Sequence, residues 1–369
     1  MLDVLTRGCS CADPGRGLLV HRLNLSPVDA VEQELGKALM VTLAASRASS
    51  TWEQYVPRFE KFMEWCAARS PPRSALPASE ITVALYLQSV LQTSNTFSVI
   101  KGTSAAISTL HEVNGYESPT EGKLCGQIRS AGERILGGRL VNQKEPLEWD
   151  VLHSYCIAAC ASGDFVRMLV AATALLAFSA FLRYSDVVSV YADEVKVFDT
   201  HAEIFLEKRK ADQLRLGSII VVARAADVRA CPVRMLVWAI SVTGSTGRHV
   251  PVFRRVDGRV VQWHPERARE TYHRSEAMPY DQCSRYVLRF LAQHAGRSEA
   301  DFRKEFGTQS LRSGGATAVA AAGVDSRMFQ RHGGWRSTGC MNLYIKDSLE
   351  ARLAVTRALP YAKGAAECE

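Results

Sequence analysis

Apolar residues recur at helical spacing through the first third of the chain. A stripe at positions i, i+3 and i+4 runs over 52–66, directly after a Ser50-x-x-Glu53 pattern that predicts a capping box at a helix start. Pro57 lies inside the stripe and predicts a kink. Ser79 is the predicted N-cap of a second helix. The four predicted helices, which would form a compact helical domain, cover about 50–66, 79–91, 98–113 and 122–136.

The second half of the chain mixes two periodicities. Helical spacing predicts helices over about 147–161 and 165–182, and Pro232 predicts the start of another. An alanine-rich helix over 311–322 is predicted to end at Gly323. The predicted fold class is mainly α, with an N-terminal four-helix domain and an α-rich second domain that contains a small antiparallel β-sheet. The predicted strands are three short segments rich in β-branched residues, at 195–198, 202–206 and 218–222.

Changes in composition along the chain predict its domain organisation. Residues 1–45 show little periodicity, which favours a loosely ordered arm with room for one short helix. A polar segment at 141–146 is the best linker candidate. We therefore predict a helical domain over 46–140, a second domain over 147–360 and a tail over 361–369.

Length, composition and charge limit the class of protein. The 369 residues include 47% hydrophobic and 22% charged side chains, which is normal for a globular protein with a sizeable core. A net charge of +7 permits an anionic partner such as nucleic acid without requiring one. The ten cysteines lack the spacing of a zinc site, and no signal peptide is recognisable. The longest apolar stretch, 168–182, is shorter than the ~20 residues that a bilayer span needs. We expect a soluble, intracellular protein without a membrane partner.

Two segments concentrate residues that could act on a phosphodiester. Near the C-terminus, Arg312 is followed 23 residues later by Trp335, and nine residues further on by Tyr344. Far upstream, Arg183 lies in an apolar setting. Guanidiniums stay charged and can bond two phosphate oxygens at once, an indole N–H can donate, and a phenol can attack phosphorus. This combination would allow an enzyme to hold and attack a phosphodiester without a metal.

Each of these residues also has an ordinary structural interpretation. Arg183 and Asp186 are three residues apart, which is typical of a structural ion pair, although Asp186 could equally orient Arg183 for binding. Tyr344 lies in an apolar run, as core and interface residues do. The turn from Lys208 to Lys210 is typical of a solvated hairpin tip. Its functional interpretation is a lysine that protonates a departing 5′ oxygen, for which we favour Lys210 over Lys208.

Taken together, these motifs resemble those of the tyrosine recombinases, also called phage-type integrases. The stretch 309–344 is similar to their C-terminal signature of His-x-x-Arg, Gly-His or Gly-Trp, and a nucleophilic tyrosine. Gly333-Gly-Trp335 resembles the Cre-like form, in which tryptophan replaces the usual histidine. Segments 310–317 and 210–213 are more similar to recombinases of Crypton and DIRS mobile elements. The resemblance covers most of the chain and implies a SAM-like core-binding domain followed by a catalytic domain.

The resemblance implies a role for each matching residue. Arg183 and Arg312 would hold the scissile phosphate. Lys210 would be the general acid, and Trp335 would donate its N–H to a phosphate oxygen. Tyr344 would form a 3′-phosphotyrosyl bond and release a 5′ hydroxyl that later attacks in reverse, as in type IB topoisomerases. Because the bond energy is kept in the covalent intermediate, no ATP, metal or other cofactor is expected.

One position departs from the family pattern. The family's histidine, three residues before the second arginine, is Gln309 in this chain. An amide can donate to a phosphate oxygen but cannot shuttle a proton, and loss of a general acid–base group typically costs about 10²–10⁴-fold. Either cleavage is slowed, a neighbour substitutes, or the protein binds DNA in an architectural or regulatory role. His332 is near in sequence, but its spacing does not fit the missing position.

The expected partner is double-stranded DNA, whose phosphates would meet cations from both domains. Self-association is also expected, with a dimer on each site and a tetramer at synapsis, because the apolar Leu349 and Leu353 after Tyr344 suit a neighbouring protomer. The protein is expected where the DNA is, in a eukaryotic nucleus or a prokaryotic nucleoid. The candidate phosphate contacts are basic residues of both domains: Lys101, Arg129, Arg134, Arg139, Lys208, Arg209 and Arg215.

Overall fold

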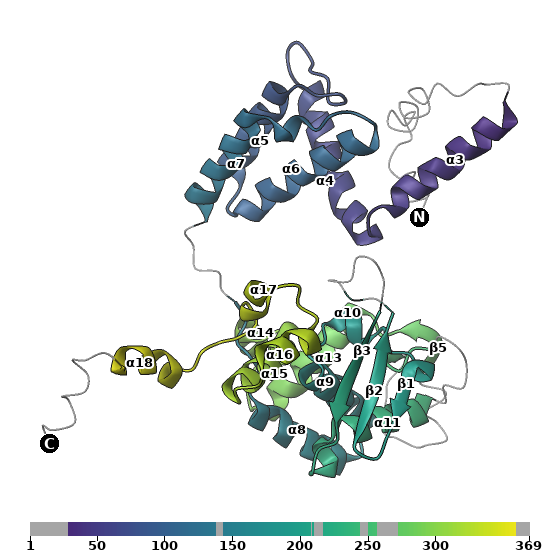
Figure 1. The fold of residues 1–369 in the computed structure, drawn as a ribbon, viewed down its shortest axis with the longest axis vertical. Helices are drawn as coiled ribbons and strands as arrows, with labels where there is room; N and C mark the ends of the chain where they lie inside the picture. The colour runs from purple at the N-terminus through teal and green to yellow at the C-terminus, as the bar shows by residue number, and fades with distance from the viewer. Residues whose placement is uncertain are drawn as a thin grey trace, which may run out of the picture. The chain divides into compact units, whose positions relative to one another are not determined.

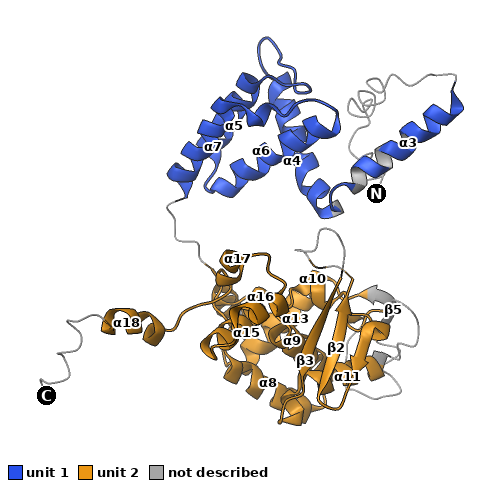
Figure 2. Ribbon diagram, in the orientation of Figure 1, with its two compact units in different colours: residues 1–141 blue, residues 142–369 orange. Residues whose placement is uncertain are grey.

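The computed structural model describes residues 29–137, 143–207, 209, 217–243, 250–256 and 272–358. The chain divides into two compact units, residues 1–141 and residues 142–369 (Figure 2). The mainly helical fold class with a small antiparallel sheet is confirmed. The tail predicted over 361–369 lies outside the described residues, as does most of the arm predicted over 1–45.

The first unit is built from helices. They are α3 (Ala30–Ala45), α4 (Ser49–Ala67), α5 (Glu80–Thr93), α6 (Phe97–Val113), the 3-10 turn η1 (Pro119–Glu121) and α7 (Lys123–Leu136). Ser79 caps α5 as predicted, since its hydroxyl accepts from the N–H of Thr82 at 3.3 Å. The capping box predicted at Ser50 is wrong. The N-cap is Ala48, without a side-chain bond, and Ser50 already lies inside α4.

Residues 30–45 form a longer helix than the sequence suggested. The carboxylate of Asp29 accepts from the N–H groups of Val31 at 2.8 Å and Glu32 at 3.1 Å, and so caps the start of α3. Val31 and Leu35 are exposed. The helix has no clear apolar stripe, so the sequence pattern did not reveal its length. Its cap and its helix-favouring residues stabilise it instead.

The core of the first unit lies where α4, α5, α6 and α7 meet. His111 of α6 is wholly buried there. Its Nδ1 lies 2.7 Å from the carbonyl of Ile107, and its Nε2 accepts from the N–H of Ala78 at 2.9 Å. These partners require a neutral ring that carries its proton on Nδ1. The buried apolar residues of this core include Phe59, Phe62, Val83, Leu87, Ile100 and Ile107.

The second unit surrounds one apolar helix. Of the 15 residues of α9 (Phe165–Ser179), 12 are buried. The helix ends at Ser179 rather than at 182 as predicted, so Arg183 lies beyond its end and not next to it. The other helices are α8 (Trp149–Ser162), α10 (Tyr184–Val187), α11 (Pro232–Thr243), α13 (Tyr280–His294), α14 (Glu299–Glu305), α15 (Gln309–Ala321), α16 (Ser326–Gly333), α17 (Thr338–Asn342) and α18 (Leu349–Arg357), with the short turns η2 (Ala192–Glu194) and η3 (Val228–Ala230).

The predicted three-stranded sheet is confirmed and lies beside these helices (Figure 1). Its strands are β1 (Val195–Val197), β2 (His201–Leu206) and β3 (Ser218–Ala223), paired antiparallel in that order. A second pair, β4 (Arg254–Val256) with β5 (Tyr272–Ala277), was not predicted. The polar sequence of β5 does not alternate with apolar residues, so the period-2 signal is missing.

Two features bear on the expected environment of the protein. Within the described ranges, no helix has the length and apolar character needed to cross a bilayer. The cysteines of the described ranges are free thiols, and most are buried.

Candidate active site

Arg183 begins the short helix α10, directly after a strained turn. Phe181 adopts φ 48°, in the left-handed region that a bulky residue rarely occupies. Asp186, which is buried, accepts from the backbone N–H of Arg183 at 3.0 Å. The same carboxylate lies 3.9 Å from Nη1 of the Arg183 side chain. The predicted pair therefore exists, but Asp186 fixes the backbone of Arg183 more directly than its guanidinium.

Arg312 of α15 has no exposed surface. Its Nη1 donates to the carbonyl of Phe181, and its Nη2 donates to the carbonyl of Gly333 at 2.9 Å. Burial first, and the nearby Arg183 second, lower the pKa of Arg312, whereas Tyr344 and Asp186 act in the opposite direction. The acceptors that hold this guanidinium are thus uncharged, and its positive charge is not cancelled by them.

Two glycines allow α15 to approach its neighbours closely. A Cβ at Gly315 would lie 2.0 Å from the carbonyl oxygen of Phe178, and one at Gly314 would lie 2.1 Å from that of Leu147. Both contacts are with backbone, which cannot move aside easily. The two glycines therefore allow α15, and with it Arg312, to pack close to the backbone of its neighbours.

Tyr344 meets both arginines although they are distant in sequence. Its hydroxyl accepts from Nη2 of Arg183 at 3.2 Å. The Cζ atom of Arg312 lies 4.6 Å from the centre of the Tyr344 ring. Thr317 of α15 donates to the backbone carbonyl of Tyr344 at 3.4 Å and accepts from the N–H of Lys346 at 3.2 Å. The tyrosine segment is thus bound to the same helix that carries Arg312.

Trp335 completes this group. A left-handed Gly334, with φ 63°, turns the chain at the end of α16 and places the indole 4.6 Å from the Cζ atom of Arg312. The Trp335 ring centre lies 5.5 Å from that of Tyr344. The indole N–H is buried and, among the described residues, has no hydrogen-bond partner. A buried donor without an acceptor is suited to a ligand oxygen.

The remaining predicted site residues have different positions. Gln309 is the first residue of α15 and is exposed. His332 does not take the place of the missing histidine, since its Nε2 is 2.9 Å from the carbonyl of Ser179 and burial lowers its pKa. The predictions for Lys208, Lys210, Arg215 and Arg139 fall outside the described residues. No three His, Cys, Asp or Glu side chains of the described part are grouped as a metal site requires.

Arg209 was predicted as a DNA contact but lies within this site. It is 6% exposed, and its guanidinium donates to the carbonyls of His332 at 3.2 Å and Gly333 at 3.1 Å. Burial lowers its pKa, with Asp186 acting in the opposite direction. The basic run around Arg209 is typical of a solvated hairpin tip, so no sequence pattern indicated that its central residue is buried.

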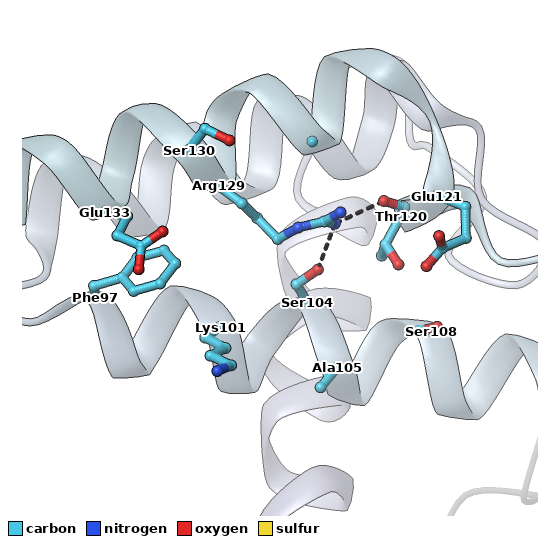
Figure 3. Close-up of a pocket in the computed structure, with 11 residues that line it drawn as sticks. Phe97, Lys101, Ser104, Ala105, Ser108, Thr120, Glu121, Arg129, Ser130 and Glu133 are labelled. Atoms are coloured by element: carbon cyan, nitrogen blue, oxygen red, sulfur yellow. Dashed lines mark hydrogen bonds between the residues drawn. The ribbon is translucent and has the colours of Figure 1, made fainter. Parts of the chain in front are cut away.

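In the first unit, predicted phosphate contacts line a groove of about 650 Å³ between α6 and α7. Lys101 lies on α6, and Arg129 reaches across from α7 (Figure 3). Nη1 of Arg129 donates to the hydroxyl of Ser104 at 3.1 Å and to the carbonyl of Thr120 at 2.6 Å. Arg134 lines an adjoining groove. The two grooves share Gly126 and Ser130, so the three cations line neighbouring grooves of the helical unit.

Comparison with known proteins agrees with this architecture. No family model matches the chain. The chain is 24% identical over 309 residues to an integrase/recombinase xerD homolog of Selenomonas ruminantium, a match that covers 82% of this chain and 83% of the relative. The structure is similar to XerH site-specific recombinase bound to palindromic difH substrate in a post-cleavage complex, with a TM-score of 0.56 and 14% identity, covering 93% of this chain and 94% of that one. The pre-cleavage complex of XerH with difH gives a TM-score of 0.51, with 13% identity and 94% of each chain covered.

The fold is that of a site-specific recombinase. In its sequence match and in the motifs carried by α10, α15 and the turn before α17, the chain is similar to the tyrosine recombinases, or phage-type integrases.

Proposed function

We propose that the protein is a site-specific DNA recombinase or integrase that breaks and rejoins DNA through a 3′-phosphotyrosyl intermediate at Tyr344. The observation that carries the proposal is the meeting of one phenol with two guanidiniums. Arg183 donates to the Tyr344 hydroxyl at 3.2 Å, and Arg312 lies against the same ring at 4.6 Å. Because a guanidinium carries a permanent positive charge, two of them favour an anion beside this hydroxyl.

In the proposed reaction, the Tyr344 hydroxyl gives up its proton to solvent, and its oxygen attacks the scissile phosphorus as the bond from phosphorus to the 5′ oxygen breaks. Arg183 and Arg312 would balance the charge on the non-bridging oxygens, and Trp335 would donate its unpartnered N–H to one of them. The departing 5′ oxygen takes a proton, for which Lys210 is the proposed donor. A 5′ hydroxyl then attacks the phosphotyrosyl bond, so the tyrosine is released and the strand is rejoined.

The cations of the first unit support a second part of the proposal, which is binding of the duplex. Two adjoining grooves would contact phosphates: the α6–α7 groove, lined by Lys101 and Arg129, and its neighbour, lined by Arg134. Such contacts position the DNA but do not read its sequence. We expect the protein to work wherever its DNA is kept, in a nucleus or a nucleoid.

Self-association on DNA is supported by α18. None of its residues is buried, and Leu349 and Val355 are 64% and 71% exposed. In Figure 1 this helix extends away from the body of its unit. We propose that it packs on a second copy, with a dimer on each DNA site and a tetramer at synapsis.

The alternative, an impaired relative that only binds DNA, was motivated by Gln309. It is not favoured, because the matched relatives are recombinases and the tyrosine meets both arginines.

A nicked suicide substrate tests the proposal, with DNA that flanks the coding region as the candidate target. The wild-type protein should become covalently attached to the DNA, and Tyr344→Phe should not. Binding in a gel without any covalent product would favour the impaired relative instead. If no salt-sensitive binding to DNA is found, both interpretations fail.

A further inference from the structure

A third guanidinium, that of Arg209, lies in the candidate site without a carboxylate of its own. It comes from the connection between β2 and β3, whereas the carbonyls that it contacts belong to the end of α16. Ion pairs of the described residues include Arg183 with Asp186, but none joins Arg209 to an acid. Burial of a charged group without a paired charge is costly, so such a residue needs a function that offsets this cost.

The contacts of Arg209 show which part of the site it supports. Its Nη2 and the Nη2 of Arg312 donate to the same acceptor, the carbonyl of Gly333, at 3.1 Å and 2.9 Å. Its Nη1 donates to the preceding carbonyl, that of His332. A planar guanidinium carries two separate terminal nitrogens in a fixed geometry, so each can donate to one of two neighbouring carbonyls. The turn that leads to Trp335 is thus held from one side by Arg312 and from the other by Arg209.

The Arg209 guanidinium packs closely against the backbone of this turn at Gly334. Gly334 has φ 63°, and a Cβ at this position would lie 2.5 Å from Nη1 of Arg209. The Nε atoms of Arg209 and Arg312 are both buried and, within the described residues, have no hydrogen-bond partner. Among the described residues, Asp186 is the carboxylate that acts on all three positive side chains, Arg183, Arg209 and Arg312.

We propose that Arg209 is a positioning residue of the phosphate site, which holds Arg312 and the Gly333–Trp335 turn in place and adds the positive charge that the neutral Gln309 does not supply. This inference rests on the proposed function. It assigns to a buried arginine of the β2–β3 connection the task of maintaining charge balance at the scissile phosphate.

The experiment compares two DNA substrates that differ by one atom group. Once the attachment point of Tyr344 has been mapped, one substrate carries the ordinary phosphodiester there. The other carries a methylphosphonate, in which a methyl group replaces a non-bridging oxygen and removes its negative charge. Single-turnover formation of the covalent product is measured for wild type, Arg209→Met and Arg224→Met. Arg224 is a matched control, because it follows β3, is exposed, and donates to the carbonyl of Phe198 at 3.2 Å.

We expect the Arg209→Met variant to cleave the phosphodiester about 10–100-fold more slowly than wild type. Its cleavage rate on the methylphosphonate should be within about threefold of the wild-type rate, because the neutral group does not need the charge of the arginines. Arg224→Met should match wild type on both substrates. Equal loss on both substrates would show a general structural defect and overturn the inference, as would no loss on either. Wild type that forms no covalent product on the phosphodiester would instead overturn the proposed function itself.

Discussion

Two arginines, one in each unit, are held in the same way but differ in exposure. Arg129 donates to a hydroxyl and a carbonyl at the wall of an open groove. Arg312 donates to two carbonyls and has no exposed surface. Because neutral acceptors fix both guanidiniums, each keeps a charge that can act on a phosphate. Their burial determines how each charge acts on DNA. The buried charge of Arg312 is little screened and interacts strongly with a single phosphate, whereas the solvent-accessible charge of Arg129 adds a small, salt-dependent contribution to affinity.

The largest effect should come from removing the buried cation. Arg312→Met is expected to lower the rate of covalent product formation by at least about 10²–10³-fold, because a preorganised donor to the transition state is lost. Single-turnover cleavage at saturating DNA measures this. Arg129→Met is the matched control and should cleave bound DNA at the wild-type rate. Equal losses in the two variants would remove the distinction between the two arginines.

The second-largest difference should be in stability, when a glycine near each arginine is replaced by alanine. Gly315→Ala places a Cβ against the carbonyl of Phe178, and should destabilise the second unit by about 2–3 kcal/mol. Gly126→Ala in α7 meets nothing closer than 4.0 Å and should stabilise its helix by up to about 1 kcal/mol. Urea unfolding of both variants provides the test. A neutral Gly315→Ala would show that α15 can move away from α9.

Each unit also contains a histidine whose pKa is lowered by burial: the wholly buried His111 in the first unit and the half-buried His332 in the second. Below a pH of about 6.5, the unfolded chain binds more protons at these histidines than the folded protein does. The free energy of unfolding therefore keeps their full contribution above that pH. It falls below that pH by up to about 1.4 kcal/mol per pH unit for each histidine. His111 should contribute more, because protonation would turn the Nε2 that accepts from Ala78 into a donor. Denaturant unfolding at pH 7.5 and 5.5 should therefore show a weaker pH dependence in His111→Gln than in His332→Gln. The reverse order would contradict the assigned ring protonation.

The half-buried Arg129 should have a smaller effect, on binding alone. Arg129→Met is expected to weaken DNA binding by about 3–10-fold at low salt and to reduce the dependence of affinity on salt by about one ion. Titrations at several salt concentrations measure both quantities. An unchanged salt dependence would mean that the α6–α7 groove does not contact phosphates.

The smallest effect is expected at the position that departs from the family. Gln309→His should raise the cleavage rate by less than about tenfold, well below the full range for an acid–base group, because Arg209 already supplies charge at the site. The pH profile of single-turnover cleavage would show whether the new ring titrates. A rate that is unchanged or lower would show that the site is arranged around the amide.

The sequence predicted the parts of this molecule that depend on local pattern. Ser79, Pro232 and Gly323 mark helix ends as expected, and the β-branched runs form the predicted strands. The spacing of Arg312, Trp335 and Tyr344 pointed to residues that do lie together.

The rest depends on tertiary contacts that leave little trace in one sequence. The apolar run of α9 continues through Leu182, so the end of the helix at Ser179 could not be seen. The left-handed Phe181 is a residue type that normally avoids this conformation, and it persists because Arg312 binds its carbonyl. Arg209 lies in a basic run, and only the fold shows that it is buried.

The tyrosine and both arginines of the candidate site belong to one chain, and Tyr344 contacts Arg183 of its own copy. If the proposed cleavage uses this arrangement, each copy cuts with its own tyrosine and arginines and does not take these groups from a neighbour. In a cell that makes intact and inactive copies together, mixed complexes would hold DNA but lack some of the cuts they need. Loss of the tyrosine in one allele would then act as a dominant-negative change rather than a silent one.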